Sequence, residues 1–228
     1  MKETGKALSR RLHLPDFATQ YFVGQGLDIG AGGDPLAQFG EAFPRMTGIR
    51  AWDLADGDPQ FLGGLADASF DFVHAPHVLQ QMADPREALR HWFRVLKPGG
   101  HLVLLIPDED MYEQGFWPSR YNHANRWTFT IFKTKSWSPV SLNLVEVLPA
   151  LGSQADIRRL DVLASGYRNN LPRFDQTLTP VAECAIELVI RKRPQAEAVA
   201  GGRINPDGPL SVGDVFILTG MRVEAPKG

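Results

Sequence analysis

Short hydrophobic runs alternate with turns rich in glycine, proline and aspartate through the first half of the chain. Four runs predict β-strands, over residues 21–29, 46–54, 70–75 and 101–106. The last run, HLVLLI, is apolar on both faces, which is typical of a central parallel strand covered by helices on either side.

Apolar residues recur at intervals of three and four over residues 83–96, which predicts a helix between the third and fourth strands. Asp84 is a suitable N-cap, Pro85 suits the first helical position, and Pro98 followed by two glycines ends the helix. The order of these elements predicts an α/β, doubly wound sheet.

The second half of the chain has a less regular pattern. We expect a helix over 141–151 and strands over 156–163 and 185–191. Residues 108–139 are rich in aromatic side chains, so we interpret them as an ordered insertion that serves as a substrate lid rather than as a disordered loop.

The two ends of the chain differ from its centre. Residues 1–20 predict a helical lead that lies on the body of the domain. From Pro194 the chain becomes rich in alanine, glycine and proline, so we expect one domain over 1–193 and a linker with a tail over 194–228. The run VFILTGMRV in that tail could add an edge strand or pair with a second copy in a homodimer.

Composition narrows the class of protein. The 228 residues carry a net charge of −2 and are 43% hydrophobic, which argues against disorder and against a polybasic nucleic-acid binder. The single cysteine, Cys184, excludes a disulfide framework. We find neither an apolar run of membrane-spanning length nor a signal peptide, and expect a cytoplasmic protein with no membrane partner.

The first predicted strand runs into a glycine-rich turn within GLDIGAGGDP, residues 26–35, and such a turn lets the backbone approach a ligand closely. Pro35 stands where a dinucleotide fingerprint needs its third glycine, and Asp34 would repel a pyrophosphate. S-adenosylmethionine has no phosphate and carries a cationic sulfonium and an amino group, so it suits this turn better. A tight turn without any ligand is the alternative.

Acidic residues follow the second predicted strand. Asp53 lies at its tip, where a carboxylate can accept hydrogen bonds from both hydroxyls of a ribose, and Asp58 follows in a loop placed to meet an adenine. Residues 51–71 hold five aspartates and neither lysine nor arginine. This pattern disfavours a phosphate-bearing cofactor, although a solvated acidic face would also explain it.

Taken together, these motifs resemble the class I S-adenosylmethionine-dependent methyltransferases of the type-11 kind. The similarity covers about residues 20–110 and depends on LDIGAGGDP, AWDL, SFDFVHAPHVLQQMADPREAL and RVLKPGGHLVLLIPDED. It implies a Rossmann-like, mostly parallel seven-stranded sheet with helices on both faces, S-adenosylmethionine as cofactor and methyl transfer as the activity.

The resemblance also implies which residues bind the cofactor. Gly30 and Gly32 would pass against its methionine part and Asp28 would orient its amino group. His74 and Ala75 would lie under the methyl group. The adenosine part would be bound by Asp53, Asp58 and Gln60. One departure is HVLQQ at 77–81, where the family commonly has H-x-L-E-H, so that glutamines replace an acid and a histidine.

A hydroxyl nucleophile gains from a general base, for which His123 is our first candidate, His77 the second and Asp108 a third. A surface histidine, a structural histidine and a helix cap are the respective alternatives. Asp108, Asp110 and His123 match no strong metal-binding pattern, so no metal is expected.

The aromatic segment supplies the candidate acceptor site. Trp117, Tyr121 and Trp127 could form a stacking wall for a sugar, or simply pack. We expect methylation of a hydroxyl on a carbohydrate or similar small molecule. Methylation of carbon or nitrogen on another acceptor, and a non-catalytic protein that binds S-adenosylmethionine, are the alternatives.

Overall fold

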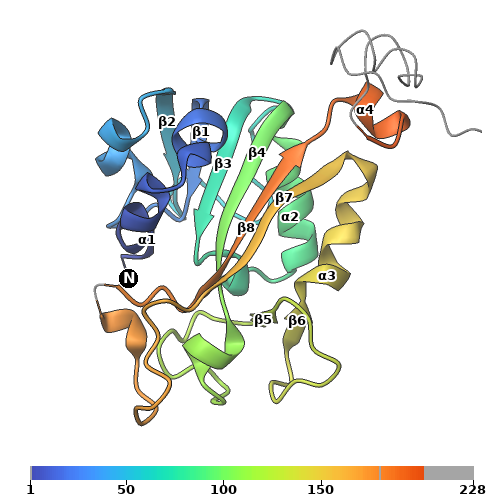
Figure 1. The fold of residues 1–228 in the computed structure, drawn as a ribbon. Coiled ribbons are helices and arrows are strands. Elements are labelled where there is room, and N and C mark those ends of the chain that lie inside the picture. The colour runs from blue at the N-terminus through green and yellow to red at the C-terminus, as the bar shows by residue number, and fades with distance from the viewer. Residues whose placement is uncertain (1, 180, 203–228) are drawn as a thin grey trace, which may run out of the picture.

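A six-stranded sheet forms the centre of the computed structural model, which describes residues 2–179 and 181–202 (Figure 1). The strand order is β2-β1-β3-β4-β8-β7. In chain order the strands are β1 (Gly24–Ile29), β2 (Met46–Trp52), β3 (Phe70–Pro76), β4 (Leu96–Pro107), β7 (Ala155–Leu163) and β8 (Ala185–Lys192).

The first four of these strands are parallel, and β8 runs antiparallel to both of its neighbours, β4 and β7. The chain moves from β1 to β2 on one side and then returns to place β3 on the other side of β1. The carboxyl ends of β1, β2 and β3 therefore meet at one edge of the sheet, where such folds bind ligands.

Helices cover both faces of the sheet. On one face lie α1 (Glu3–Leu12) and the short helices η1 (Phe17–Tyr21) and η2 (Leu36–Ala42). The other face carries the short helix η3 (Leu79–Gln81), then α2 (Pro85–Arg94), α3 (Leu144–Val147) and η5 (Leu148–Gln154). Each face of the sheet has its own hydrophobic core, and successive residues of a strand point to opposite faces. Phe72 of β3 therefore packs with η1, whereas Val73 packs with α2.

The predicted α/β doubly wound sheet is thus confirmed. It contains six strands among the described residues rather than seven, because residues 53–69 cross from β2 to β3 through a series of turns. Asp84 caps α2 as expected, since its Oδ1 accepts hydrogen bonds from the backbone N–H groups of Arg86 (2.8 Å) and Glu87 (3.3 Å).

The second half departs from the predicted pattern in two places. The helix expected over 141–151 begins instead as a strand, β6 (Ser141–Asn143), which pairs in parallel with β5 (Thr128–Thr130). The predicted linker begins with the helix α4 (Gln195–Val199), in which Glu197 pairs with Arg191 of β8 at 2.7 Å.

Further short helices are η4 (Glu109–Glu113) and η6 (Gln176–Leu178). The edge strand expected over 215–223 lies outside the described residues. None of the helices in the described ranges is both long and apolar enough to cross a membrane.

Candidate active site

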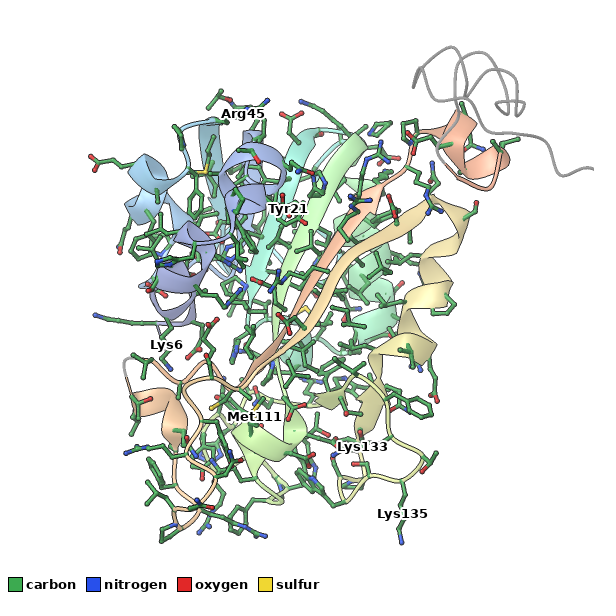
Figure 2. The ribbon with its side chains drawn as sticks, in the orientation of Figure 1. Lys6, Tyr21, Arg45, Met111, Lys133 and Lys135 are labelled. Carbon is green, nitrogen blue, oxygen red and sulfur yellow. The ribbon has the colours of Figure 1, made fainter. Side chains whose placement is uncertain are left out.

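A cavity of about 990 Å³ lies at the carboxyl ends of β1, β2 and β3. Its walls come from five parts of the chain: Glu3 and Thr4, residues 30–34, residues 52–60 with gaps, residues 76–83 with gaps, and the segment of His123, Ala124 and Arg126. Figure 1 shows the N-terminal end of α1 at this same lower edge of the sheet, and Figure 2 labels Lys6 there.

The glycine loop provides one wall. Gly30 and Gly32 have φ angles of +67° and +47°, a region that favours glycine. A Cβ on Gly30 would come within 2.5 Å of Cγ2 of Val78, so a side chain at this position has no room. The loop therefore presents bare backbone to the cavity.

Asp28 and His74 support this loop from beneath and do not line the cavity. Asp28 is 1% exposed; its Oδ2 accepts a hydrogen bond from the Leu36 N–H at 2.7 Å, and its Oδ1 lies 2.7 Å from His74 Nδ1. The His74 Nε2 lies 3.1 Å from Nη1 of Arg11, which can only donate, so Nδ1 carries the proton and donates it to Asp28. Burial lowers the pKa of His74, in keeping with a neutral ring.

The expected contacts of Asp28 with the amino group and of His74 with the methyl group therefore do not fit this placement. Both side chains point to the face that α1 covers, because alternate residues of a strand face opposite sides. Ala75 points to the other face and packs in the hydrophobic core there.

Three residues predicted to bind adenosine do line the cavity. Asp53 is partly exposed, and its Oδ1 accepts a hydrogen bond from the Gly32 N–H at 3.1 Å, which joins the ends of β1 and β2. Asp58 is exposed beside it. The amide of Gln60 is already engaged, because Oε1 accepts from the Asp84 N–H (2.9 Å) and Nε2 donates to Glu87 (3.3 Å).

His77 follows β3 and lines the cavity in an unusual backbone conformation, with φ of +54°. The side-chain amides of Gln80 and Gln81 donate to its carbonyl at 2.6 and 3.2 Å. The two glutamines that depart from the family pattern thus hold the backbone of His77.

The His77 ring is 3% exposed, and neither of its nitrogens has a hydrogen-bond partner among the described residues. Burial, with a smaller contribution from the charge of Lys6, lowers the pKa of His77 to about 3. The ring is therefore neutral near pH 7 and can accept one hydrogen bond and donate another.

The aromatic segment reaches the cavity through residues 123–126. The N–H groups of Arg126 and Trp127 donate to the carbonyl of Gln80 at 2.8 and 3.2 Å, which attaches this segment beside η3. His123 is exposed and lines the same cavity as His77. Two of the three predicted bases therefore line the same cavity.

Asp108 does not reach the cavity. Its Oδ1 accepts hydrogen bonds from the N–H groups of Asp110 (3.1 Å) and Met111 (3.2 Å), so it caps η4, which was the structural alternative. Burial raises the pKa of Asp108 to about 6.

The predicted stacking wall is absent from the cavity lining, which includes neither Trp117, Tyr121 nor Trp127. Trp127 packs on the main core and donates from Nε1 to the Met82 carbonyl at 3.0 Å. Tyr121 packs edge-on against Tyr112, with ring centroids 6.2 Å apart. Both rings belong to a cluster with Met111, which Figure 2 labels. Trp127 and Tyr121 thus pack within the protein, which was the alternative to a stacking wall, and Trp117 is partly exposed outside the cavity lining.

Sequence reasoning missed Glu3 and Thr4. Glu3 is 4% exposed; its Oε1 accepts from Lys6 Nζ at 3.0 Å, and its Oε2 lies 3.8 Å from His77 Nε2. Burial raises the pKa of Glu3 to about 7, against the opposing effect of Lys6. No periodicity or motif along the chain connects residue 3 with residue 77.

The lining fits S-adenosylmethionine. It offers the carboxylates of Glu3, Asp53 and Asp58, bare glycine backbone, and one lysine or arginine among the described lining residues, Arg126. Such a set suits a cofactor with a ribose, a sulfonium and an ammonium, and would repel a pyrophosphate.

Comparisons with known proteins agree with this reading. Residues 38–104 match the family model of a methyltransferase domain. Over 70 residues the chain is 50% identical to an uncharacterized 37.1 kDa protein in transposon TN4556 of Streptomyces fradiae. That match covers 31% of this chain and 20% of the relative, so the chain spans about a fifth of the relative's length.

A solved structure has a similar fold. The crystal structure of a putative methyltransferase from Bacillus halodurans superposes with a TM-score of 0.51 at 15% identity, over 83% of this chain and 100% of that one. Residues 38–104 thus resemble a methyltransferase domain, and the likeness in fold to a solved structure extends over 83% of the chain.

Proposed function

We propose that the protein transfers a methyl group from S-adenosylmethionine to a hydroxyl of a carbohydrate or similar small molecule. The observation that carries this proposal is that the glycine loop, Asp53, His77 and His123 line one cavity. Its volume of about 990 Å³ lies at the upper end of the roughly 300–1,000 Å³ of small-molecule sites, which favours a small acceptor beside the cofactor.

In this proposal the carboxylate of Asp53 accepts hydrogen bonds from the ribose hydroxyls, and Asp58 lies beside the adenine. Gly30 and Gly32 leave the backbone open to the methionine part. When bound, S-adenosylmethionine supplies a methyl group on a positively charged sulfur, already activated toward attack.

The residues of the chain then align the acceptor and take its proton. The neutral ring of His77 orients the acceptor hydroxyl by a hydrogen bond, and alignment of this kind can contribute about 7–11 kcal/mol. Since the low pKa of His77 makes it a weak base, we assign the proton to His123, which is exposed and can pass it to water. A positioned base contributes about 10²–10⁴-fold.

Calorimetry tests the cofactor site. We expect S-adenosylmethionine and its demethylated product to bind, and Asp53→Asn to weaken both by about tenfold or more, the loss expected for hydrogen bonds to a charged group. Asp67→Asn is the matched control, because it replaces the same side chain at a position that pairs with Arg94 and does not line the cavity. A wild-type protein that binds neither ligand would overturn the proposal.

Transfer of a labelled methyl group to a panel of hydroxylated small molecules tests the acceptor. We expect His123→Gln to lower the rate by about 10²–10⁴-fold and to leave cofactor binding unchanged. Transfer only to amine or carbon acceptors would replace the hydroxyl assignment, and binding without transfer to any acceptor would favour the non-catalytic alternative.

A further inference from the structure

The strand order indicates how a bound cofactor must run through the cavity. Asp53 and Asp58 follow β2, the glycine loop follows β1 and His77 follows β3, and the order of these strands is β2-β1-β3. If adenosine binds at β2, as its acids require, the amino-acid part extends across β1 toward the end of β3. The first turn of α1 lines the cavity at that end.

The amino-acid part carries an ammonium and a carboxylate, and each needs a partner in a buried site. Asp28 does not face the ammonium, because it is 1% exposed, lies outside the cavity lining and directs its oxygens to Leu36 and His74 beneath the loop. Glu3 is the buried carboxylate at the β3 end; Oε1 is paired with Lys6, while Oε2 lies 3.8 Å from His77, beyond hydrogen-bond distance.

Thr4 offers the complementary group. Its side chain is 2% exposed and lines the cavity, and its Oγ1 has no hydrogen-bond partner among the described residues. A buried hydroxyl without a partner is costly, so a ligand that accepts its hydrogen bond gains affinity. The N-terminal end of a helix also favours a negative group.

The geometry holds this turn against the glycine loop. The Gly5 N–H donates to Asp34 Oδ2 at 3.0 Å, so a residue of the loop caps α1. Further along the helix, Arg11 is bound to Glu187 of β8 at 3.0 Å. Glu3 and Thr4 are therefore positioned relative to the loop before any ligand arrives.

We propose that the first turn of α1 binds the amino-acid end of S-adenosylmethionine, with the Glu3 carboxylate on the ammonium and the Thr4 hydroxyl on the carboxylate. This inference rests on the proposed function and adds to its cofactor site two residues that lie at the start of the chain, far from the glycine loop in sequence.

Two ligands distinguish binding of the amino-acid end from binding of the rest of the cofactor. S-adenosylhomocysteine carries the amino-acid part, whereas 5′-methylthioadenosine shares the adenosine and the sulfur but lacks it. For Glu3→Gln we expect an affinity loss of about 10- to 100-fold for S-adenosylhomocysteine, as for a lost charge-assisted hydrogen bond. Affinity for 5′-methylthioadenosine should stay unchanged, which also shows that the variant is folded.

Thr4→Val should weaken only S-adenosylhomocysteine, and Thr4→Ser should restore it. Glu41→Gln, the same change at an exposed glutamate of η2, should leave both affinities as in the wild type. Unchanged S-adenosylhomocysteine binding by Glu3→Gln, or an equal loss for both ligands, would overturn the inference while leaving the proposed function intact. A wild type that binds neither ligand would overturn both.

Discussion

At the scale of single residues, burial and hydrogen bonding decide which acid can bind a ligand. Asp28 and Asp53 stand at the ends of neighbouring strands, yet only Asp53 keeps part of its carboxylate exposed in the cavity. The five aspartates of residues 51–71 also differ in their partners. Asp67 pairs with Arg94 at 2.6 Å, Asp71 pairs with Lys97 at 2.9 Å, and Asp56 accepts a hydrogen bond from the Asp53 N–H at 3.0 Å. Asp53 and Asp58 line the cavity.

The glycine loop allows a prediction with an internal control. Gly30→Ala places a Cβ at positive φ and within 2.5 Å of Val78, so we expect the free energy of unfolding to fall by about 1–3 kcal/mol. At Gly33 a Cβ has no neighbour within 4 Å, and Gly33→Ala should change stability by no more than about 0.5 kcal/mol. Urea denaturation of both variants is the measurement, and equal effects would contradict this account of the loop.

At the scale of elements, α1 is attached to the sheet by buried charges as well as by apolar packing. Arg11 is 1% exposed and connects Glu187 of β8 with His74 of β3, and its guanidinium lies over the rings of Phe17 and Phe22. The ring of His74 in turn holds Asp28. The N-terminal helix is thus connected, through Arg11 and His74, to Asp28, which supports the glycine loop.

Removing this connection should be costly. We expect Arg11→Met to lower the free energy of unfolding by about 3 kcal/mol, the lower end for a broken buried ion pair, because Arg10 still contacts Glu187. Arg86→Met, at an exposed position of α2, should stay within about 0.5 kcal/mol of the wild type. Chemical denaturation checks both variants, and a wild-type midpoint for Arg11→Met would show that α1 is held by packing alone.

At the scale of the whole molecule, the net charge of −2 conceals buried groups whose ionisation is coupled to folding. His101 lies on β4 beneath η1, with its ring 5.2 Å from that of Tyr21. Burial, aided by the charge of Arg191, lowers the pKa of His101 to about 4. The unfolded chain takes up this proton near pH 6.5 and the folded protein only near pH 4, so the stability it contributes is present above pH 6.5 and is lost toward pH 4.

A comparison with His101→Gln isolates this group from others that titrate in the same range. The free energy of unfolding of the wild type relative to the variant should fall by up to about 1.4 kcal/mol for each pH unit between 6.5 and 4. Urea denaturation at several pH values measures the difference. A difference that does not change with pH would contradict the assignment.

The local features of this protein are determined by the sequence alone. The strands β1 to β4, the helix α2 with its Asp84 cap, the bare glycine loop and the acid after β2 all follow from periodicity or from residues within a few positions of one another. Short-range sterics and hydrogen bonds govern these features, so they leave a readable pattern.

Only the tertiary structure decided the rest of the site. It engages Asp28 with His74 beneath the loop, packs Tyr121 and Trp127 against the rest of the protein, and brings Glu3 to the cavity. Most of these outcomes depend on packing between segments distant in the chain, and several depend on which face of a strand a side chain occupies. Contacts of this kind leave no repeat or spacing in the sequence, because the partners are close in the folded protein but far apart along the chain.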